Sequence, residues 1–324
     1  MRSLDEIDRR ILETLREDGR ATWATLARRV EIPDSTIYRR TSALFDEGRI
    51  RVGVLPTAPA EEVRLYELRF RCRPGRQRDV ARTLAARTDM RWVAVVTGDY
   101  GVAAELVVPL GVEAAAVIFD DIEQRDDNIV GSQSSLVLHT FKVPGNLQHG
   151  FVFDAAVELR ELTAGDRATL AALRDDGRLS YAAVAAQVGI SESTIRRRLG
   201  TMLKASDAAV VTVVHPPSLG FEHEAIIRLD VLPEHLESVA RQLASHAGVH
   251  YLAATFGETA LVCEIVMRTP GETYEFLNDV IAKARGITRM TVEVELIVMK
   301  RAFLPTPWTQ EAPVALSRAS AVRG

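Results

Sequence analysis

The chain has 324 residues, 47% of them hydrophobic and 26% charged, and a formal net charge of −4. This length and composition predict an ordinary globular protein of about two domains or more. The slightly acidic balance excludes a global basic field, so a nucleic-acid partner would need a locally basic surface.

Targeting and redox signals point to the cytoplasm. The first ten residues, MRSLDEIDRR, are too charged for a signal peptide, and no apolar run reaches the roughly 18 residues of a membrane span. Cys72 and Cys263 are the only cysteines, and no Cys/His cluster has zinc-ligand spacing. We therefore expect a cytoplasmic protein with reduced thiols and without a metal, a cofactor or a membrane partner.

Residues 1–60 have the pattern of three short helices. LDEIDRRILETLRED places its leucines and isoleucines on one helix face, and Gly19 ends that helix. TWATLARRV predicts a second helix, and a third covers residues 34–46 after the tight connection EIP. The segment GRIRVGVLP alternates like a strand pair or a wing.

Residues 61–145 change to strand-like patterns. EVRLYELRFRCRP precedes the amphipathic helix GRQRDVARTLAARTD, and MRWVAVVTGDYGVAAELVVP gives two strands around a Gly-Asp turn. GVEAAAVIFDDIEQRD reads as a helix and IVGSQSSLVLHTFKV as a last strand. The order β-α-β-β-α-β predicts a split βαβ, ferredoxin-like domain.

The second half of the chain repeats the first. Asp18-Gly19-Arg20 and Ser35-Thr36-Ile37 recur 158 residues later as Asp176-Gly177-Arg178 and Ser193-Thr194-Ile195. We predict an α+β chain in which a winged helix-turn-helix domain plus a ferredoxin-like domain is duplicated. The predicted boundaries are 1–60 and 61–145 for the first copy, 146–160 for a linker, 161–218 and 219–304 for the second copy, and 305–324 for a disordered or lightly docked tail.

The heptamers DSTIYRR (residues 34–40) and ESTIRRR (residues 192–198) open the third helix of each copy. Two short helices, a tight turn and a helix that begins with small hydroxyls and runs into arginines are typical of a helix-turn-helix, whose second helix reads the major groove. A single basic helix is usually only a solvated face, but here the pattern occurs twice. The candidate DNA-contacting residues are Ser35, Thr36, Tyr38, Arg39, Arg40, Arg49 and Arg51 in the first copy and Ser193, Thr194, Arg196, Arg197 and Arg198 in the second.

DEIDRRILETLREDGRATWATLARRVEIPDSTIYRR resembles the N-terminal domain of the Lrp/AsnC family of bacterial transcription regulators. VVTGDYGVAAELVV resembles the glycine-turn segment of that family's C-terminal amino-acid-sensing (RAM) domain, an ACT-like βαββαβ fold. The resemblance covers nearly the whole chain, twice. Family members are usually half this length and pair through their C-terminal sheets. The resemblance therefore implies a covalent pseudo-dimer that binds double-stranded DNA and associates further with itself.

Fusion frees the two reading helices from being identical. A symmetric dimer prefers a palindromic site because both of its helices read the same bases. Here Tyr38 stands where the second copy has Arg196. Arginine favours guanine or phosphate, whereas tyrosine offers a ring for a thymine methyl group. We therefore expect an asymmetric operator.

In the family, effectors that are often amino acids bind between sensing domains near the glycine turn. The candidates carried over by motif are Gly98, Asp99, Tyr100, Ser132 and Ser134 in the first copy and Gly257, Glu258 and Thr259 in the second. The same Gly-Asp dipeptide is also favoured in plain hairpin turns. Gly101 and Ala260 replace an aspartate of many family members, so either the ligand is not an ordinary amino acid or the domain only assembles.

Two other functions remain open at this point. Siroheme decarboxylases share this architecture and also occur as fused pairs, but the seven histidines here are scattered and form no His-x-Tyr-x-Arg-like cluster. No nucleophile triad, P-loop or metal-ligand spacing indicates another enzyme class, so the sequence predicts a protein that is not an enzyme. The other alternative is an architectural DNA-compacting protein with weak sequence preference.

Overall fold

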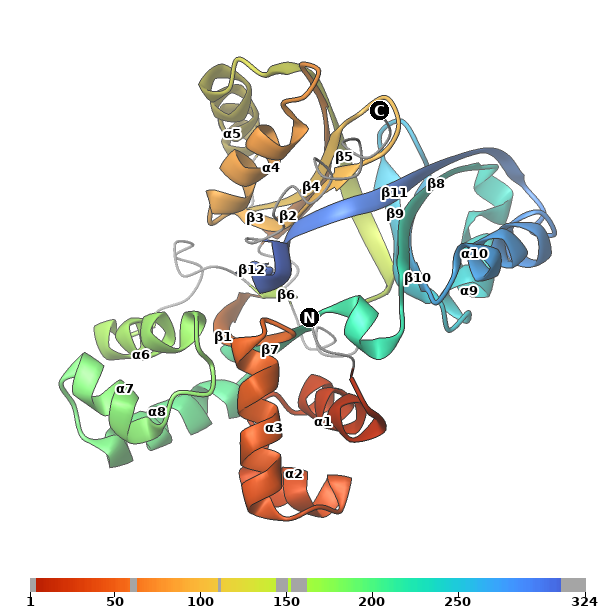
Figure 1. Cartoon of the computed structure of the whole chain (residues 1–324). Coiled ribbons are helices and arrows are strands. Elements are labelled where there is room, and N and C mark those ends of the chain that lie inside the picture. The colour runs from red at the N-terminus through yellow and green to blue at the C-terminus, as the bar shows by residue number, and fades with distance from the viewer. Residues whose placement is uncertain (1–3, 59–62, 110–111, 144–150, 153–161, 310–324) are drawn as a thin grey trace, which may run out of the picture.

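The computed structural model describes residues 4–58, 63–109, 112–143, 151–152 and 162–309. Figure 1 shows two helical domains at one end of the molecule and a strand barrel with outer helices at the other. The strands β1 (Ile50–Ala58) and β7 (Ala208–Val214) lie between them. In the described part of the chain, no helix is long and apolar enough to cross a membrane.

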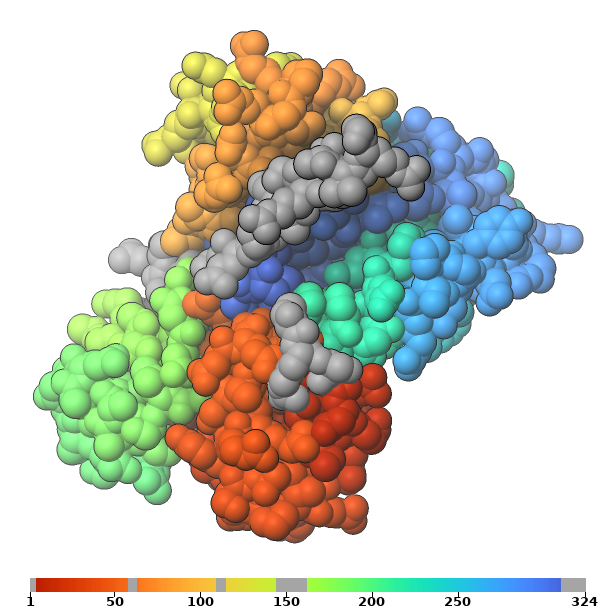
Figure 2. All heavy atoms as spheres, viewed as in Figure 1, coloured from red at the N-terminus to blue at the C-terminus, as the bar shows by residue number. Residues whose placement is uncertain are grey.

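Each half starts with the predicted three-helix domain. The helices are α1 (Glu6–Glu17), α2 (Trp23–Val30) and α3 (Asp34–Asp46) in the first half, and α6 (Ala164–Arg174), α7 (Tyr181–Val188) and α8 (Glu192–Lys204) in the second. Polar side chains cap five of these helices by accepting a backbone N–H, and they belong to Asp5, Thr22, Thr163, Ser180 and Ser191. The apolar residues at helical spacing form one buried core in each domain. Figure 2 shows the two domains as adjacent lobes.

The strand after each third helix pairs with its counterpart in the other half. β1 and β7 run antiparallel, from Ile50 opposite Val214 to Pro56 opposite Ala208. Gly53 pairs with Val211, which lies 158 residues later, so a pseudo-twofold axis passes between them. The segment that could have been a strand pair or a wing is therefore one strand of a ribbon shared by both halves.

Both halves contain the predicted βαββαβ order. The elements are β2 (Val63–Cys72), α4 (Gln77–Ala86), β3 (Met90–Val96), β4 (Val102–Pro109), α5 (Val112–Arg125) and β5 (Ile129–Lys142), then β8 (His223–Val231), α9 (Leu236–Ala244), β9 (Val249–Phe256), β10 (Leu261–Met267), α10 (Pro270–Phe276) and β11 (Ile287–Arg301). Short helical turns at Pro216–Leu219, Pro233–His235 and Leu277–Ile281 complete the second copy.

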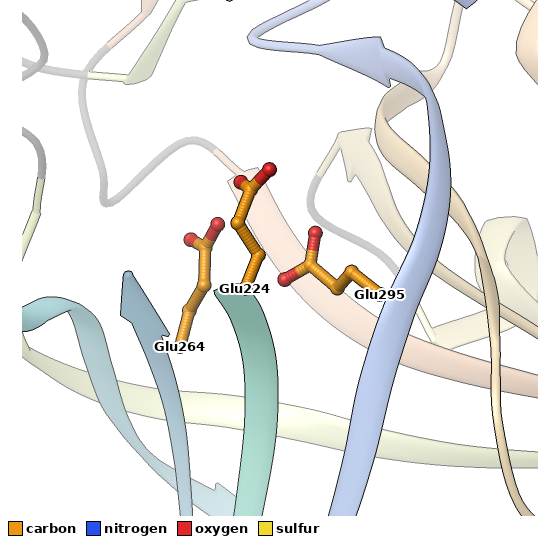
Figure 3. A group of neighbouring side chains, drawn as sticks. All are labelled: Glu224, Glu264 and Glu295. Atoms are coloured by element: carbon orange, nitrogen blue, oxygen red, sulfur yellow. The ribbon is translucent and has the colours of Figure 1, made fainter. Parts of the chain in front are cut away.

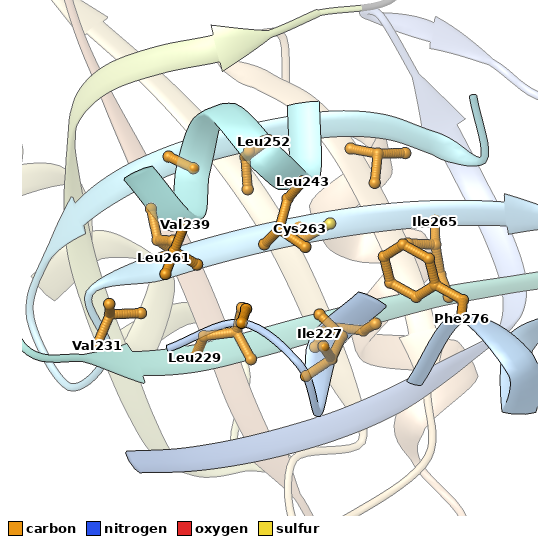
Figure 4. Close-up of a cluster of buried hydrophobic side chains, with 14 of the residues drawn as sticks. Ile227, Leu229, Val231, Val239, Leu243, Leu252, Leu261, Cys263, Ile265 and Phe276 are labelled. Carbon is orange, nitrogen blue, oxygen red and sulfur yellow. The ribbon is translucent and has the colours of Figure 1, made fainter. Parts of the chain in front are cut away.

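These eight strands close into one barrel. Their order is β11-β3-β4-β2-β5-β9-β10-β8, and β8 pairs back with β11. Two seams join the halves, because β5 pairs with β9 and β11 with β3. The helices cover the outside of the barrel: Figure 4 shows Leu243 packing by Leu252 and Cys263 of the sheet, and Phe276 packing beside Ile265. Neither cysteine forms a disulfide in the structure; Cys263 is buried and Cys72 is half-buried.

The first residues of the predicted tail dock on the molecule. β12 (Leu304–Pro305) pairs with the end of β11, and Pro307–Thr309 form a helical turn. We call residues 302–309 the C-terminal strap. Phe303 and Leu304 are buried, and Trp308 packs on His215 with the ring centroids 5.0 Å apart. The rest of the tail lies outside the described residues, as does the predicted linker except for β6 (Phe151–Val152), which pairs with β1.

Candidate nucleic-acid interface and sensing domains

Helix α3 presents most of its predicted reading residues to solvent. Ser35, Tyr38 and Arg39 are exposed and Thr36 is half-buried, whereas Ile37 is fully buried. No side chain caps the N-terminus of α3, so its first N–H groups can receive a phosphate.

Helix α8 presents the corresponding face of the second half. Ser193, Arg196 and Arg197 are exposed and Thr194 is half-buried. Ser191 caps this helix by accepting the backbone N–H of Thr194 at 3.3 Å. The N-terminus of α8 is therefore less available to an anion than that of α3.

The Tyr38/Arg196 difference belongs to a pair of linked changes. In the first half Trp23 of α2 contacts Tyr38 edge to face, with the ring centroids 5.4 Å apart. In the second half Tyr181 of α7 lies beneath the Arg196 guanidinium at 5.0 Å, and Arg196 also pairs with Glu192 at 2.9 Å. Both reading residues are thus held by the preceding helix.

The last arginine of each heptamer has a structural role. Arg40 pairs with Asp5 at 2.7 Å and with the fully buried Asp8 at 3.0 Å. Hydrogen bonds to these carboxylates raise the pKa of Arg40. Arg198 repeats the contact with Asp166 at 3.1 Å. The prediction that Arg40 and Arg198 face DNA is not supported, because each guanidinium pairs with a carboxylate of its own helical domain.

Arg49 and Arg51 both have partners within the protein. Arg49 is buried and donates to Glu47 at 3.1 Å and to Ser218 at 3.2 Å. Arg51 pairs with Asp175 of the other helical domain at 3.0 Å. The predicted phosphate contact of Arg49 is corrected because its side chain is buried, whereas the phosphate contact of the partly exposed Arg51 stays a prediction.

The repeated Asp-Gly-Arg loops connect the two helical domains, which the sequence reading missed. Arg178 donates to the carbonyls of Gly19 at 2.7 Å and Ala21 at 3.0 Å, and Arg20 donates reciprocally to Gly177. Each guanidinium also lies over an aromatic ring of the other half. The glycine is required because a Cβ at Gly177 would lie 2.9 Å from the backbone of Gly53. The exact recurrence of Asp-Gly-Arg in both copies was the sequence signal that could have indicated this contact between the domains.

The second glycine turn is occupied by contacts from the first half. Glu258 pairs with Arg69 and, at 3.5 Å, with Arg289. Burial opposes the charged carboxylate of Glu258, but these arginines hold its pKa below the usual value. Gly257 packs closely against Ser135, and Thr259 is buried.

The first glycine turn is more open. Gly98 adopts a φ of +93°, in the region that favours glycine, and Asp99 is exposed. The Tyr100 ring lies under the guanidinium groups of Arg69 and Arg71, at 4.3 and 5.2 Å.

Ser132 and Ser134 do not join either turn. Both are exposed, and Ser132 donates to Glu123 of α5 on the outside of the barrel. Their neighbours Gln133 and Ser135 face the turn instead, since Gln133 accepts from Arg69. The structure thus places the Ser132 and Ser134 hydroxyls on the outer face of β5, away from both glycine turns.

Charged side chains fill the barrel interior. Arg228 donates to Glu67 of the other half at 2.9 Å and to Glu293 at 3.2 Å. Arg91 pairs with Glu105, yet burial raises the pKa of Glu105 to about 7. The sequence reading missed this network, although Glu105 and Glu264 interrupt the same apolar strand in both copies.

One end of the interior holds an acidic cluster. Arg301 contacts Glu224, Glu264 and Glu295 at 2.5, 3.1 and 3.4 Å. Figure 3 shows the three carboxylates, from β8, β10 and β11, pointing toward one another. Burial opposes a charged Glu264, but Arg301 and His250 hold its pKa at about 2. Burial and the two neighbouring carboxylates raise the pKa of Glu295 well above its usual value.

Known protein families match both kinds of domain. The AsnC-type helix-turn-helix domain matches residues 4–44 and 162–203, and a C-terminal dimeric alpha+beta barrel domain matches residues 218–304. Two helix-turn-helix domains on an α+β barrel thus define the class of protein.

Curated relatives agree with this class. An uncharacterized HTH-type transcriptional regulator of Pyrococcus furiosus is 32% identical over 136 residues, which cover 42% of this chain and 92% of the relative. HTH-type transcriptional regulator FL11 of Pyrococcus abyssi is 30% identical over 145 residues, with coverage of 43% and 93%. The chain belongs to the Lrp/AsnC family of HTH-type transcriptional regulators.

A solved structure shares the whole duplicated architecture. Siroheme decarboxylase NirDL aligns over 93% of this chain and 94% of its own, with a TM-score of 0.61 and 14% sequence identity. At this identity the likeness shows the fold alone.

Proposed function

We propose that the chain is a sequence-specific DNA-binding transcriptional regulator that works as a covalent pseudo-dimer. The observation that carries the proposal is the pair of helices α3 and α8, each with an exposed hydroxyl and arginine face, held about the axis between Gly53 and Val211. Paired reading helices suit two half-sites along one duplex.

The first helical domain is expected to bind its half-site more strongly. Arg28 is exposed beside α3, whereas the second half has Ala186 at the corresponding position. The N-terminus of α3 also has no side-chain cap. Each added phosphate contact strengthens binding to any sequence and steepens its salt dependence.

Selection of bound duplexes from a random pool tests this proposal. The unmodified chain should enrich a non-palindromic site with two half-sites about one helical turn apart. Tyr38→Arg should change the preferred bases in one half-site only, and Arg196→Tyr in the other. No enriched motif at fixed salt would contradict a gene-specific regulator and favour architectural DNA compaction.

We also propose the first glycine turn, Gly98 to Tyr100, as the effector position carried over from the family. Its exposed Asp99 supports this choice, whereas Glu258 of the second turn already pairs with Arg69 and Arg289. Further self-association would bring this turn against another chain.

The barrel chemistry does not favour a siroheme decarboxylase. His250, Tyr251, Arg91 and Arg301 line a cavity of about 50 Å³, and His250 and Arg301 also line an adjoining cavity of about 550 Å³, so charge and not volume opposes a tetrapyrrole. The three carboxylates of the acidic cluster would repel the carboxylates of an acidic tetrapyrrole. Incubation with siroheme should therefore leave its absorption spectrum unchanged.

A further inference from the structure

The first residue of α2 and of α7 is aromatic, and each of these rings is half-buried. Trp23 of α2 meets the Tyr38 ring of α3 edge to face, with the centroids 5.4 Å apart and the planes at 79°. Tyr181 of α7 lies beneath the Arg196 guanidinium of α8, at 5.0 Å. The aromatic residue that opens the second helix therefore supports the reading residue on the third helix.

Each of these rings also carries a guanidinium from the other helical domain. The guanidinium carbon of Arg178 lies 4.5 Å from the centroid of Trp23, and that of Arg20 lies 5.3 Å from the centroid of Tyr181. Two lines of contact thus cross between the halves. We call them the first relay, Arg178–Trp23–Tyr38, and the second relay, Arg20–Tyr181–Arg196.

Backbone carbonyls fix the arginine that begins each relay. Arg178 donates to Gly19 at 2.7 Å and to Ala21 at 3.0 Å, and Arg20 donates to Gly177. Burial, together with the nearby Arg20 charge, lowers the pKa of Arg178. Because two like charges repel here, the carbonyl oxygens and the ring faces are what hold the guanidinium groups in place.

The two reading residues differ in their other support. Arg196 also pairs with Glu192 at 2.9 Å. Tyr38 is 59% exposed, and among the described residues Trp23 is its one partner by hydrogen bond, ion pair or ring contact. The orientation of Tyr38 therefore depends on the first relay more than the orientation of Arg196 depends on the second.

We propose that Arg178 of the second half positions Tyr38 of the first half for base reading through Trp23. The second relay acts in the same way in the opposite direction. Each half-site is then read by a side chain whose orientation the other helical domain controls. This inference rests on the proposed DNA-binding function and deepens it, because it makes Arg178 and Arg20 positioning residues for recognition.

Selection of bound duplexes with variants of the full-length chain tests the proposal. Arg178→Ala should lower the discrimination between bases roughly fivefold at the base pair that Tyr38 reads. The half-site read by α8 should keep its preferred bases, since Arg20 still joins the two loops. Equal loss in both half-sites would overturn the proposal, because Arg178 would then only hold the domains together.

The second relay should respond less to loss of its arginine. Arg20→Ala should lower discrimination only about twofold at the base pair read by Arg196, because Glu192 still holds that side chain. Arg82→Ala is the matched control, since it removes one exposed positive charge from the barrel helix α4. It should leave the preferred bases of both half-sites unchanged.

A double variant tests whether the effect passes through the ring. Trp23→Leu keeps an apolar side chain at the start of α2 but removes the aromatic face. Arg178→Ala added to Trp23→Leu should cause no further loss of discrimination at the base pair read by Tyr38. A further loss as large as that of Arg178→Ala alone would overturn the relay.

Fluorine NMR of the chain labelled with 3-fluorotyrosine tests the same coupling without DNA. The chain has six tyrosines, and Tyr38→Phe identifies the signal of Tyr38. Arg178→Ala should shift this signal in the unmodified chain and leave it in place in Trp23→Leu. The signals of the barrel tyrosines report an intact fold, and they belong to Tyr66, Tyr100, Tyr251 and Tyr274.

The two experiments separate this inference from the proposed function. If the unmodified chain selects no DNA motif, the proposed function fails, while the fluorine spectra still decide whether the relay exists. A Tyr38 signal that stays in place in Arg178→Ala would overturn the relay even if the chain selects a clear motif.

Discussion

Two adjacent arginines at the end of DSTIYRR have different roles. Arg39 is exposed on α3, whereas Arg40 joins α3 to α1 through the fully buried Asp8. Helical spacing alone could not separate them, because the partner lies 32 residues away in the sequence. The recurrence of this acid as Asp166 was a usable signal, since a charged residue among inward-facing positions needs a partner.

Replacing these arginines should separate stability from DNA binding. Arg40→Met should lower the free energy of unfolding by roughly 2–3 kcal/mol, because it leaves Asp8 buried without its guanidinium. Arg39→Met should leave the free energy of unfolding unchanged and lower DNA affinity roughly tenfold. Urea denaturation and titration with the selected duplex measure the two effects. Equal stability of both variants would contradict the role given to Arg40.

His215 should make stability depend on pH. Burial and the nearby Arg49 lower its pKa to about 4 in the folded chain, against about 6.5 when unfolded. The unfolded chain therefore binds more protons between these values, and the free energy of unfolding falls as the pH drops from about 6.5 to 4. His215→Gln should flatten this slope in urea denaturations at pH 7, 6 and 5. Parallel slopes for the variant and the parent would reject the assignment.

The strands and their order along the chain can be predicted from the alternation of apolar and polar residues, but the strand with which each one pairs cannot. Alternation in GRIRVGVLP predicts a strand, yet β1 finds its neighbour in β7, which begins about 150 residues later. Likewise SQSS in β5 is polar at every position, so the sequence does not say which hydroxyls face the barrel. The register with β2 decides this by bringing Gln133 and Ser135 inward. Tertiary pairing therefore determines the parts that local pattern leaves open.

The Asp-Gly-Arg loops should fix the spacing of the two reading helices. Arg20→Ala combined with Arg178→Ala removes both reciprocal contacts to carbonyls of the other half. When two base pairs are inserted between the half-sites, the DNA affinity of the unmodified chain should fall roughly tenfold or more. The DNA affinity of the double variant should fall much less. Competition binding with the two duplexes provides the comparison. An unchanged spacing preference would show that the β1–β7 ribbon alone holds the helices.

The two halves of the barrel are complementary rather than equivalent. The first half contributes a balanced set to the interior, with Arg69 and Arg91 beside Glu67 and Glu105. The second half contributes more carboxylates than arginines. The duplication was predictable from the repeated motifs. This division of charge was not, because it depends on which strand positions face inward.

Separated halves should therefore associate unequally. Residues 1–143 expressed alone should form a homodimer, since the open β3 and β5 edges can pair with a second copy. Residues 162–309 should dimerise more weakly, because two copies would bury the acidic cluster twice. Light scattering after gel filtration measures both, and mixing the fragments should restore a one-to-one complex. Equally stable homodimers would contradict this complementarity.

The C-terminal strap gives the molecule a polarity that its duplicated plan lacks. It docks beside Gly48 and His215, and the described residues contain no second strap of this kind. If the two reading helices recognise unlike half-sites, every copy on a promoter must face the same way. Proteins bound upstream and downstream of the chain would then contact different surfaces of it.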